Sequence, residues 1–596
     1  MGDSLAGELR DDPRDHARPP RRPSVTAALR GRYARASGAR KATLGRALDR
    51  AERVAALASV EADMERVAAW RREVLLAIRQ RDLFGRRQVP AASERERLAG
   101  WRRRIRELRA ERARLAGGGA LPFSWESHFP DVMRRGGFCV VLGNPPWVRL
   151  HRIPPAARAA LRARYVVFRY AAWERGASLA RAGAGFGAQA DLAALFVERS
   201  VSLLRDGGVL GLLLPAKLWR ALAGGGVRRL LAERTDLLAL DDWSDSPAAF
   251  DAVVYPSSLV ARRRDRAARP AESLPGATLC ATLRRRNGPV TWEMPREALH
   301  LDGEIGAPWL VLPPAARAAF DRVTRAGVPL ADSRFGAPTL GVKCGCNAAF
   351  VVTVCSVAGE VATVRAGDRM GTVERWMLRP LLRGESLAAR DAGVAHAAMS
   401  GDGGEHIVWT HGAAGPVLDR LPPLAERWLA PWQRALRARS DVRGGARWWS
   451  LFRTGGAAAN RARVVWADFG RAPRVRVLLP GDPTVPLNSC YVLPCRDPSD
   501  ARALAALLHS PLAAAWLNAL AEPARGGYHR YLGWTMSLLP IPADWDAARA
   551  VLAPLALTEE GNGGGESTPA TLLAAATRAY KLRARDVDPL VTWNAG

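Results

Sequence analysis

Lysine is scarce in this chain of 596 residues, although basic residues as a whole are abundant. A common metal-dependent nuclease core needs an acidic residue two positions before a lysine, and no lysine of this chain has one there. We therefore expect no nuclease of that type in this chain. The lysines are Lys41, Lys217, Lys343 and Lys581.

Cysteine is also sparse, and most cysteines stand inside apolar runs. This placement predicts reduced thiols packed in the core. Cys344 and Cys346 form the one close pair, and no second pair or histidine cluster follows at the spacing of zinc ligands, so we expect no metal site. The cysteines are Cys139, Cys280, Cys344, Cys346, Cys355, Cys490 and Cys495.

Long apolar runs are missing as well. The N-terminal residues are rich in Asp, Arg and Pro and contain no apolar core of a signal peptide. The most apolar long segment, 504–520, is flanked or interrupted by Arg502, His509 and Pro511, which favours a buried helix over a membrane span. We expect a cytoplasmic protein without a membrane partner.

Acidic residues are too few to balance the basic ones. Asp and Glu number 58 and Lys and Arg 88, which gives a formal net charge of +30. GC-rich coding explains why arginine replaces lysine, but it does not explain the excess over acids. Such a charge favours a polyanionic partner, and nucleic acid, double-stranded DNA above all, is the first candidate. The length is sufficient for several domains with large cores.

The apolar run Phe138–Leu142 organises the chain, and it predicts a buried parallel strand. The residues after it suit the binding of a planar amino group, whose lone pair is delocalised into its ring. Asn144 offers a side-chain carbonyl and Pro145 a main-chain carbonyl, and Pro146 restricts the backbone that aims the latter. Trp147 offers a flat stacking face, which contributes roughly 1–3 kcal/mol for a base on an aromatic ring. A strand followed by a plain Pro-Pro turn is the alternative.

The neighbourhood of this motif resembles the amino-group DNA methyltransferases, and most closely the TaqI-like N6-adenine class that includes fused type IIG restriction–modification enzymes. The stretches that carry the resemblance are 125–130, 136–138 and 143–147. That family usually has Asp where Cys139 stands and often Tyr where Trp147 stands, and tryptophan keeps the stacking face. The resemblance implies that the catalytic residues are Asn144, Pro145, Pro146 and Trp147.

Residues 121–265 read as alternating strands and helices, with a helix stop at the turn Asp206-Gly207-Gly208. Their order resembles the second half of a methyltransferase sheet. In that family an aromatic residue near the last strand packs against the extruded base, which implies this role for Phe250, with an ordinary core phenylalanine as the alternative. The expected elements are helix 191–204, strand 209–214, helix 227–233, strand 237–240 and strand 252–260.

The first half of such a sheet is missing. S-adenosylmethionine, the cofactor that the resemblance implies, needs a glycine turn after the first strand and an acidic residue for its ribose. Residues 1–135 contain no such pattern, and the one Gly-rich candidate, 183–187, follows a polar helical stretch. We therefore expect the cofactor half to be lost or to lie on a partner polypeptide. A sheet that starts at its fourth strand would also expose an apolar edge.

Residues 301–545 resemble the TaqI-like target-recognition region. The matching stretches are 341–351, 379–384, 463–466, 487–491, 525–528 and 539–542. Their short β-type runs, glycine turns and scattered Arg and Trp suit phosphate contact and base stacking. A packed β-rich domain with solvated arginines is the alternative. The resemblance implies DNA-binding roles for Lys343, Arg383, Arg525 and Tyr528.

The expected fold class is α/β: a partial Rossmann-like class I methyltransferase sheet with an N-terminal helical arm and a β-rich α+β target-recognition domain. Residues 1–40 are Arg-, Pro- and Gly-rich and we expect them to be disordered. Helices are expected at 43–78 and 93–115, either as a solvated hairpin or as an arm that contacts phosphates or a partner. The expected domains are a basic helical region 1–120, a catalytic half 121–300, a target-recognition domain 301–545 and a linker with a C-terminal helix 546–596.

The favoured function is site-specific adenine-N6 methylation of DNA in a restriction–modification or phage-defence system, by one part of a split enzyme. The target adenine would be flipped out of the duplex, which costs a few kcal/mol. A non-catalytic DNA-binding specificity subunit is the first alternative, because the cofactor half is missing. Methylation of RNA or of a protein glutamine is the second, since Asn-Pro-Pro-aromatic motifs also serve those substrates.

Overall fold

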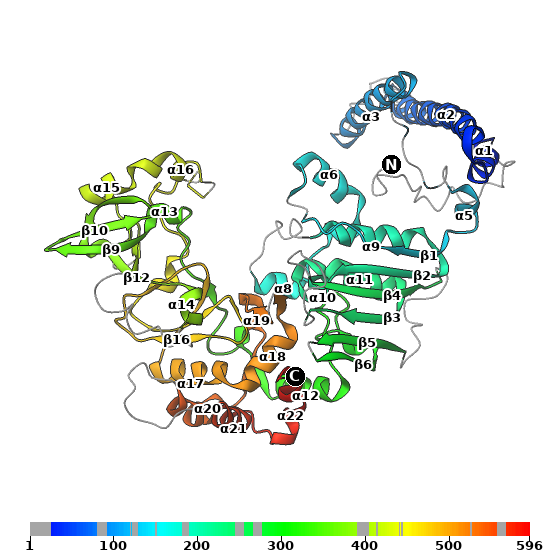
Figure 1. Cartoon of the computed structure of the whole chain (residues 1–596). Coiled ribbons are helices and arrows are strands. Elements are labelled where there is room, and N and C mark those ends of the chain that lie inside the picture. The colour runs from blue at the N-terminus through cyan, green and yellow to red at the C-terminus, as the bar shows by residue number, and fades with distance from the viewer. Residues whose placement is uncertain are drawn as a thin grey trace, which may run out of the picture. The chain divides into compact units, whose positions relative to one another are not determined.

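The fold is that of a computed structural model of the chain, drawn in Figure 1. By its internal contacts the chain divides into two compact units, Met1–Cys139 with Leu203–Gly208, and Val140–Ser202 with Val209–Gly596. The structure describes residues 25–79, 92–119, 121, 125, 129–149, 152–180, 190–244, 255–265, 277–285, 287–389, 404–412, 415–439, 441–442, 445–524, 527–556 and 568–595.

The first unit is built around a long helical hairpin. Helix α2 (Gly38–Arg79) packs on α3 (Ala92–Ala116), which confirms both predicted helices. The core of the hairpin consists of Val60, Val67, Leu108 and Leu115. The prediction of disorder up to residue 40 is wrong for α1 (Val25–Ala34), whose Arg30 pairs with Glu52 of α2. Local helix propensity and this ion pair outweigh the Arg-rich composition there.

A six-stranded mixed sheet follows, with the strand order β1-β2-β4-β3-β5-β6. Strand β4 runs antiparallel to both β2 and β3, and β3 runs parallel to β5. The predicted strands 209–214, 237–240 and 252–260 correspond to β2, β3 and β4, although 252–254 lie outside the described residues. The bounds are β1 (Phe138–Gly143), β2 (Leu204–Pro215), β3 (Thr235–Asp242), β4 (Pro256–Arg263), β5 (Thr278–Arg285) and β6 (Gly288–Pro295).

Strand β2 begins five residues earlier than predicted, because Asp206-Gly207-Gly208 is part of the strand and not a turn that precedes it. Gly207 has a φ of +74°, which a glycine adopts without steric cost. The helix before the strand, α9 (Leu192–Leu203), is confirmed. So is α11 (Gly225–Arg234), which packs on β3 through Val227 and Leu231.

Strand β1 lies at the edge of the sheet, so the prediction that it is buried is wrong. Its Val140 and Leu142 side chains are 52% and 78% exposed. Within the described residues β1 has one strand neighbour, β2, and its other edge is open. The two strands run in the same direction, because Phe138 lies opposite Gly208 and Leu142 opposite Gly211. The apolar edge that an incomplete sheet would expose is therefore present.

The described residues after 300 form four further sheets. A six-stranded sheet, ordered β11-β10-β9-β13-β12-β17, surrounds a core that includes Phe350, Val364 and Trp428. Its strands are β9 (Val351–Ala358), β10 (Val361–Ala366), β11 (Arg369–Glu374), β12 (Leu378–Leu382), β13 (Glu405–Val408) and β17 (Val485–Pro486). Its helices are α13 (Asn347–Phe350), α15 (Pro423–Leu429) and α16 (Gln433–Arg437), whereas α14 (Gly384–Ala389) packs on β14 (Ala462–Ala467) of the next sheet.

The other sheets are smaller. One orders β16 (Val475–Leu478), β14 (Ala462–Ala467), β18 (Cys490–Cys495) and β8 (Thr339–Leu340). A second orders β15 (Phe469–Gly470), β20 (Tyr528–Arg530) and β19 (Glu522–Ala524), and a third pairs β21 (Pro540–Pro542) with β7 (Gly327–Pro329). The remaining helices include α12 (Pro314–Arg325), α17 (Pro498–His509), α18 (Pro511–Leu520), α19 (Gly533–Ser537), α20 (Trp545–Leu552), α21 (Pro569–Ala579) and α22 (Ala584–Ala595).

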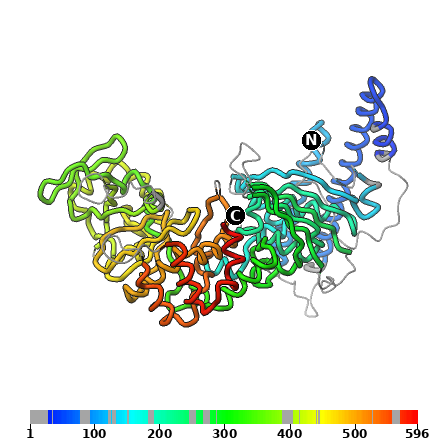
Figure 2. The backbone as a smooth tube through the Cα atoms, turned by 60° about the horizontal axis from the view of Figure 1, so that its bottom comes forward, coloured from blue at the N-terminus to red at the C-terminus, as the bar shows by residue number. Residues whose placement is uncertain are grey.

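The largest core joins segments that are distant in sequence. It includes Trp173 and Leu222 together with Phe320, Trp516 and Leu590, and the rings of Phe320 and Trp516 stack with centroids 4.8 Å apart. The C-terminal helix α22, red in Figure 2, packs on α12 and α18. Because this core crosses residues 300 and 545, the four-domain division stays a prediction.

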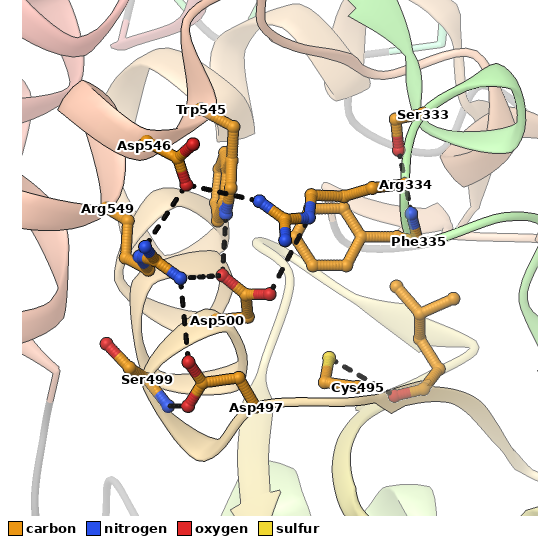
Figure 3. Close-up of polar contacts among 11 residues, drawn as sticks. Ser333, Arg334, Phe335, Cys495, Asp497, Ser499, Asp500, Trp545, Asp546 and Arg549 are labelled. Atoms are coloured by element: carbon orange, nitrogen blue, oxygen red, sulfur yellow. Dashed lines mark hydrogen bonds and ion pairs between the residues drawn. The ribbon is translucent and has the colours of Figure 1, made fainter.

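The apolar segment 504–520 is buried, as predicted, but it forms two helices. Ser510 ends α17 and caps α18, and the helices meet at 67°. No single helix of the described residues has the length and apolarity to cross a membrane, although this bent pair would pass by composition. Asp500, near the start of α17, is 3% exposed and accepts hydrogen bonds from Trp545 and Arg549 of α20 (Figure 3).

The cysteines divide between core and surface. Cys344, Cys490 and Cys495 are buried, and burial raises the pKa of each thiol to about 12. The expectation of core thiols is wrong for three cysteines whose side chains lie on parts of strands that are open to water: Cys139, Cys280 and Cys355. In the part of the chain that the structure describes, no group of His, Cys, Asp or Glu could hold a metal ion.

Candidate functional site

The Asn-Pro-Pro-Trp motif forms the loop that leaves β1. Asn144 and Pro146 are exposed, Pro145 is buried and Trp147 is partly buried. The carboxamide of Asn144 is therefore open to a ligand, while the buried ring of Pro145 fixes the backbone that carries its carbonyl. An accessible acceptor beside a restrained one is the arrangement that binding of an amino group requires.

Aromatic packing fixes the start of the same strand. Phe138 meets Trp125 and Phe129 edge to face, with centroids 5.8 and 5.3 Å apart. Trp125 and Phe129 are themselves stacked at 5.7 Å. Such pairs contribute about 0.5–1.5 kcal/mol beyond their buried area. These contacts hold the beginning of β1, and its end carries the motif.

The chain beyond the motif is tied to the start of α9. The amide of Leu192 donates to the Val148 carbonyl over 2.8 Å, and Arg149 forms a β-bridge with Asp191. The Asp191 side chain is 2% exposed. Its carboxylate accepts from the Ala193 amide at 3.2 Å, as a helix cap, and from Nζ of Lys217 at 2.9 Å. These contacts fix the exit of the motif loop.

Lys217 begins α10 (Lys217–Arg220), immediately after β2. Its side chain is 34% exposed, so its ammonium reaches both Asp191 and solvent. The sequence analysis assigned no role to Asp191 or Lys217. The sequence did contain a signal for both residues. Asp191 stands at the start of a predicted helix, and Lys217, one of few lysines, follows the end of a predicted strand. Sheets of this class place functional side chains at such positions.

The hairpin of β19 and β20 reaches the same place from the far end of the sequence. Glu522 pairs in register with Arg530. Burial raises the pKa of the Glu522 carboxyl, while the nearby charges of Arg530, Lys217, Arg149 and Arg228 act in the opposite direction. Strand β19 also contacts α10. Glu522 therefore lies among the cations that surround the exit of the motif loop.

Tyr528, a predicted DNA-binding residue, lies on this hairpin. Its ring stacks on Phe469 of β15, with centroids 4.8 Å apart and planes within 11°. The guanidinium of Arg471 lies 5.5 Å from the Tyr528 ring. Phe469 is 40% exposed. An exposed aromatic pair beside an arginine is suited to base stacking.

Lys343 stands beside the core that includes Phe350 and Trp428, between its members Val342 and Cys344, and Arg383 follows strand β12. Lys343 is exposed, and its backbone pairs with Phe452. Arg383 forms an ion pair of 2.6 Å with Glu405, so much of its charge is already balanced. It lies near enough to Cys344 to act on the pKa of that thiol, which places it close to Lys343.

Two residues of the matching stretches are structural and not exposed to DNA. Arg463 is 1% exposed and donates to the carbonyls of Thr484 and Asp482. Trp466 is fully buried, and its indole donates to the Tyr531 carbonyl at 3.2 Å. The expectation that Arg and Trp there suit phosphate contact and stacking is wrong for this pair, because β14 is buried on both faces. Phe250, Arg525 and the stretch 183–187 lie outside the described residues.

The described residues do not fit the cofactor by themselves. Every regular element that they form before β1 is a helix: α1, α2, α3 and α5 (Pro130–Arg134). A strand followed by a glycine turn, which the cofactor needs, is not found in that described stretch, because its glycine turn at 117–119 follows the helix α3. The cofactor site therefore needs groups beyond those that the structure describes here.

Comparison with known proteins finds a similarity to restriction–modification methylases. Residues 57–250 match the family described as Eco57I restriction-modification methylase. The chain is similar to the type II methyltransferase M.PaeR7I of Pseudomonas aeruginosa, with 26% identity over 431 residues that cover 68% of this chain and 65% of the relative. This chain thus spans less than two thirds of the length of that relative.

Solved structures of restriction–modification enzymes are also similar. The type IIL enzyme MmeI in complex with DNA has 11% identity and a TM-score of 0.48, over 79% of this chain and 56% of that one. The ATP-dependent type ISP enzyme LlaBIII bound to DNA has 10% identity and a TM-score of 0.37, over 79% of this chain and 34% of that one.

Proposed function

We propose that this chain is the catalytic and target-recognition part of a site-specific DNA adenine-N6 methyltransferase that acts in the cytoplasm in restriction–modification or phage defence. One observation carries the proposal: an accessible Asn144 and a restrained Pro145 follow strand β1, inside the region that matches a restriction–modification methylase. The sequence relative is itself a type II methyltransferase.

Each residue of the motif has a distinct role in this proposal. The Asn144 carboxamide oxygen and the Pro145 carbonyl accept the two hydrogens of the adenine amino group, which draws the nitrogen toward tetrahedral geometry and frees its lone pair. Pro146 holds the direction of the Pro145 carbonyl. Trp147 stacks on the flipped base, and Phe250 is proposed to pack on it from the other side.

The methyl donor is S-adenosylmethionine, and we propose that a partner polypeptide carries its binding half. The open edge of β1 supports this, because Leu142 is 78% exposed and an unpaired edge is a template for another strand. A parallel strand of the partner would cover Val140 and Leu142 and extend the sheet beside the motif.

Double-stranded DNA is the proposed substrate. The net charge of +30 supports a polyanionic partner, and residues 301–545 are proposed to recognise the site. Lys343, Arg383, Arg525 and Tyr528 are the proposed contacts. Tyr528 has the strongest support of these, because its stack with Phe469 lies on the hairpin that reaches the motif loop.

One observation favours a second candidate, a DNA-binding specificity subunit without transferase activity. The described residues before β1 are helical, so the chain does not itself provide the cofactor half there. Such a subunit would keep the fold and the charge but would transfer no methyl group in any complex.

The deciding experiment measures transfer of a labelled methyl group to duplex DNA, with this chain alone and with a polypeptide that carries the cofactor half. We expect activity with the pair only, and we expect Asn144→Ala to abolish it while DNA affinity changes by no more than a few fold. Asn594→Ala, an exposed asparagine of α22, is the matched control. Methyl transfer that survives Asn144→Ala would exclude the proposed role of the motif.

A further inference from the structure

Charged side chains from three separate segments gather where the motif loop ends. Arg149 follows the motif, Lys217 follows β2, and Arg530 comes from β20. Three carboxylates lie among them, one of which, Asp468, is close enough to Arg530 for that charge to act on the pKa of its carboxyl. The Asp191 carboxylate accepts a hydrogen bond of 2.9 Å from Nζ of Lys217. Glu522 is close enough to all three cations for their charges to act on the pKa of its carboxyl.

The hairpin presents these groups on one face. Residues that pair directly across antiparallel strands point to the same side. Arg530 pairs with Glu522 on one neighbour and with Phe469 on the other. Tyr528, two residues from Arg530, shares this face and stacks on Phe469. The face therefore carries an aromatic pair and an arginine beside Glu522.

The positive charges of this cluster exceed the negative ones. The charges of four cations, counting Arg228, act on Glu522, and Asp191 and Asp468 are the other carboxylates of the cluster. Arg228 is fully buried and donates to main-chain carbonyls, so its guanidinium has no room for a ligand. Arg149 and Arg530 are exposed, and Lys217 is 34% exposed. Three accessible cations gathered in one place attract an anion.

We propose that Arg149, Lys217 and Arg530 form a phosphodiester-binding site for the DNA strand that carries the target base. Guanidinium groups bind phosphate oxygens in pairs, and an ammonium adds a point charge. Glu522 offsets part of the mutual repulsion of the three cations when DNA is absent. The Phe469–Tyr528 stack on the same face supports a nucleotide beside the phosphate.

This site rests on the proposed function for the choice of DNA as ligand, but it does not require methyl transfer. A phosphate bound here would join the motif loop to the recognition region, because Arg149 directly follows the motif whereas Arg530 lies near the end of the recognition region, after residues 301–524. Binding of one phosphate would fix the hairpin against the motif loop, and this gives Glu522 and Lys217 a positioning role.

The test is a salt titration of binding between the full chain and a short fluorescent DNA duplex. Each phosphate contact contributes roughly 0.9 to the slope of log affinity against log salt. We expect Arg149→Gln and Arg530→Gln each to lower the slope by about that amount. Lys581→Gln is the matched control, because Lys581 is paired with Asp544 on the C-terminal helices. We expect it to leave the slope unchanged.

Glu522→Gln gives a prediction of the opposite sign. It removes a negative charge from the centre of the cluster with little change of shape, so we expect tighter DNA binding by several fold at low salt. A purely structural role for Glu522 would predict weaker or unchanged binding. Lys217→Gln leaves buried Asp191 without its partner, so Lys217→Arg is the variant to use there, and it should keep the slope.

The outcomes separate this site from the proposed methyltransferase. Lower slopes for both arginine variants without any methyl transfer would support the phosphate site and overturn the transferase. Unchanged slopes for Arg149→Gln and Arg530→Gln, in chains that unfold at the wild-type temperature, would overturn the phosphate site even if methylation proceeds. Weaker binding by Glu522→Gln would also overturn it.

Discussion

The ammonium of Lys217 lies 2.9 Å from a carboxylate oxygen of Asp191, and the two partners differ sharply in burial. Asp191 is 2% exposed, whereas the Lys217 side chain is 34% exposed. The carboxylate therefore depends on this pair, while the ammonium retains access to water. The cost of breaking the pair should differ with the partner that is removed.

The first prediction follows from this asymmetry. Lys217→Met leaves a buried, unpaired carboxylate, and we expect it to lower the unfolding free energy by about 3 kcal/mol, the low end of the range for a broken buried pair. Asp191→Asn leaves a lysine that reaches water, and it should cost clearly less. Thermal unfolding of both variants and of the double variant measures this. Equal losses would mean that the pair contributes through packing only.

The second prediction concerns the stacking face of Trp147. Trp147→Tyr keeps an aromatic ring for the flipped base, so most of the activity of the complete complex should remain. Trp147→Ala removes the ring and should lower kcat/KM by about ten-fold or more, since a base on an aromatic contributes roughly 1–3 kcal/mol. A fluorescent adenine analogue in the duplex reports base flipping directly. Flipping that is unchanged in Trp147→Ala would contradict the stacking role.

The third prediction concerns the open edge of β1. A lysine in place of Leu142, which is 78% exposed, blunts an edge strand against pairing. We expect Leu142→Lys to reduce self-association of the isolated chain in analytical ultracentrifugation and to prevent assembly with the cofactor-bearing partner. Leu479→Lys, at a residue that is 42% exposed after β16, is the control. Assembly that is unaffected by Leu142→Lys would place the partner elsewhere.

The fourth prediction concerns acid stability. His300 is 9% exposed, and burial, with the charges of Arg228 and Arg317, lowers its pKa from 6.5 to about 4, against an opposing effect of Asp302. The folded state thus holds His300 neutral, while the unfolded chain takes up a proton near pH 6.5. Its contribution to stability is complete above that pH and is lost as the pH falls toward 4.

At roughly 1.4 kcal/mol for each pKa unit, the loss reaches on the order of 3 kcal/mol at the acid end. His300→Phe removes this titration and keeps an aromatic ring against Trp309. Its melting temperature should therefore fall less than that of the wild type between pH 7 and pH 4. Because His509 and His529 also have lowered pKa values, the pH dependence should be reduced and not abolished. Equal decreases in the melting temperature of the variant and the wild type between pH 7 and pH 4 would show that His300 does not titrate in that range.

The fifth prediction concerns site preference. Tyr528→Phe keeps the stack on Phe469, and it should leave the recognised sequences unchanged. Tyr528→Ala exposes Phe469 alone and should weaken binding or alter the profile of methylated sites. Sequencing of methylated positions across a genome measures that profile. A profile unchanged by Tyr528→Ala would make the stack structural.

Local patterns explain which parts of this fold were predictable. The strand 209–214, the helix 191–204 and the hairpin helices carry strong apolar periodicity, so their positions could be predicted from neighbouring residues alone. The exposure of β1 could not be predicted. Burial of an apolar strand depends on whether a neighbouring strand exists, and the sequence around the exposed Val140 is the same in either case.

The site shows the same division. The motif 144–147 could be found because its residues are adjacent, whereas Lys217, Asp191 and Glu522 meet only through the fold. Arg463 and Trp466 illustrate the converse. Their residue types suit DNA, but β14 lies between two other strands of its sheet and buries them. Nothing about Arg463 or Trp466 taken alone shows whether its side chain is buried or exposed to DNA.

Arg228 limits the positions at which segments of this chain could be recombined with segments of its relatives. Its guanidinium donates to the carbonyls of Leu218, Trp219 and Ala221, and twice to that of Gly306, at 2.7–3.2 Å. Main-chain carbonyls are available from any sequence, but only if the segment around Gly306 takes the same path. A hybrid joined before Gly306 would leave a buried cation dependent on a foreign loop. A hybrid joined after Leu312 would inherit the arginine and all its acceptors from one parent, and recombination that changes specificity should favour that side.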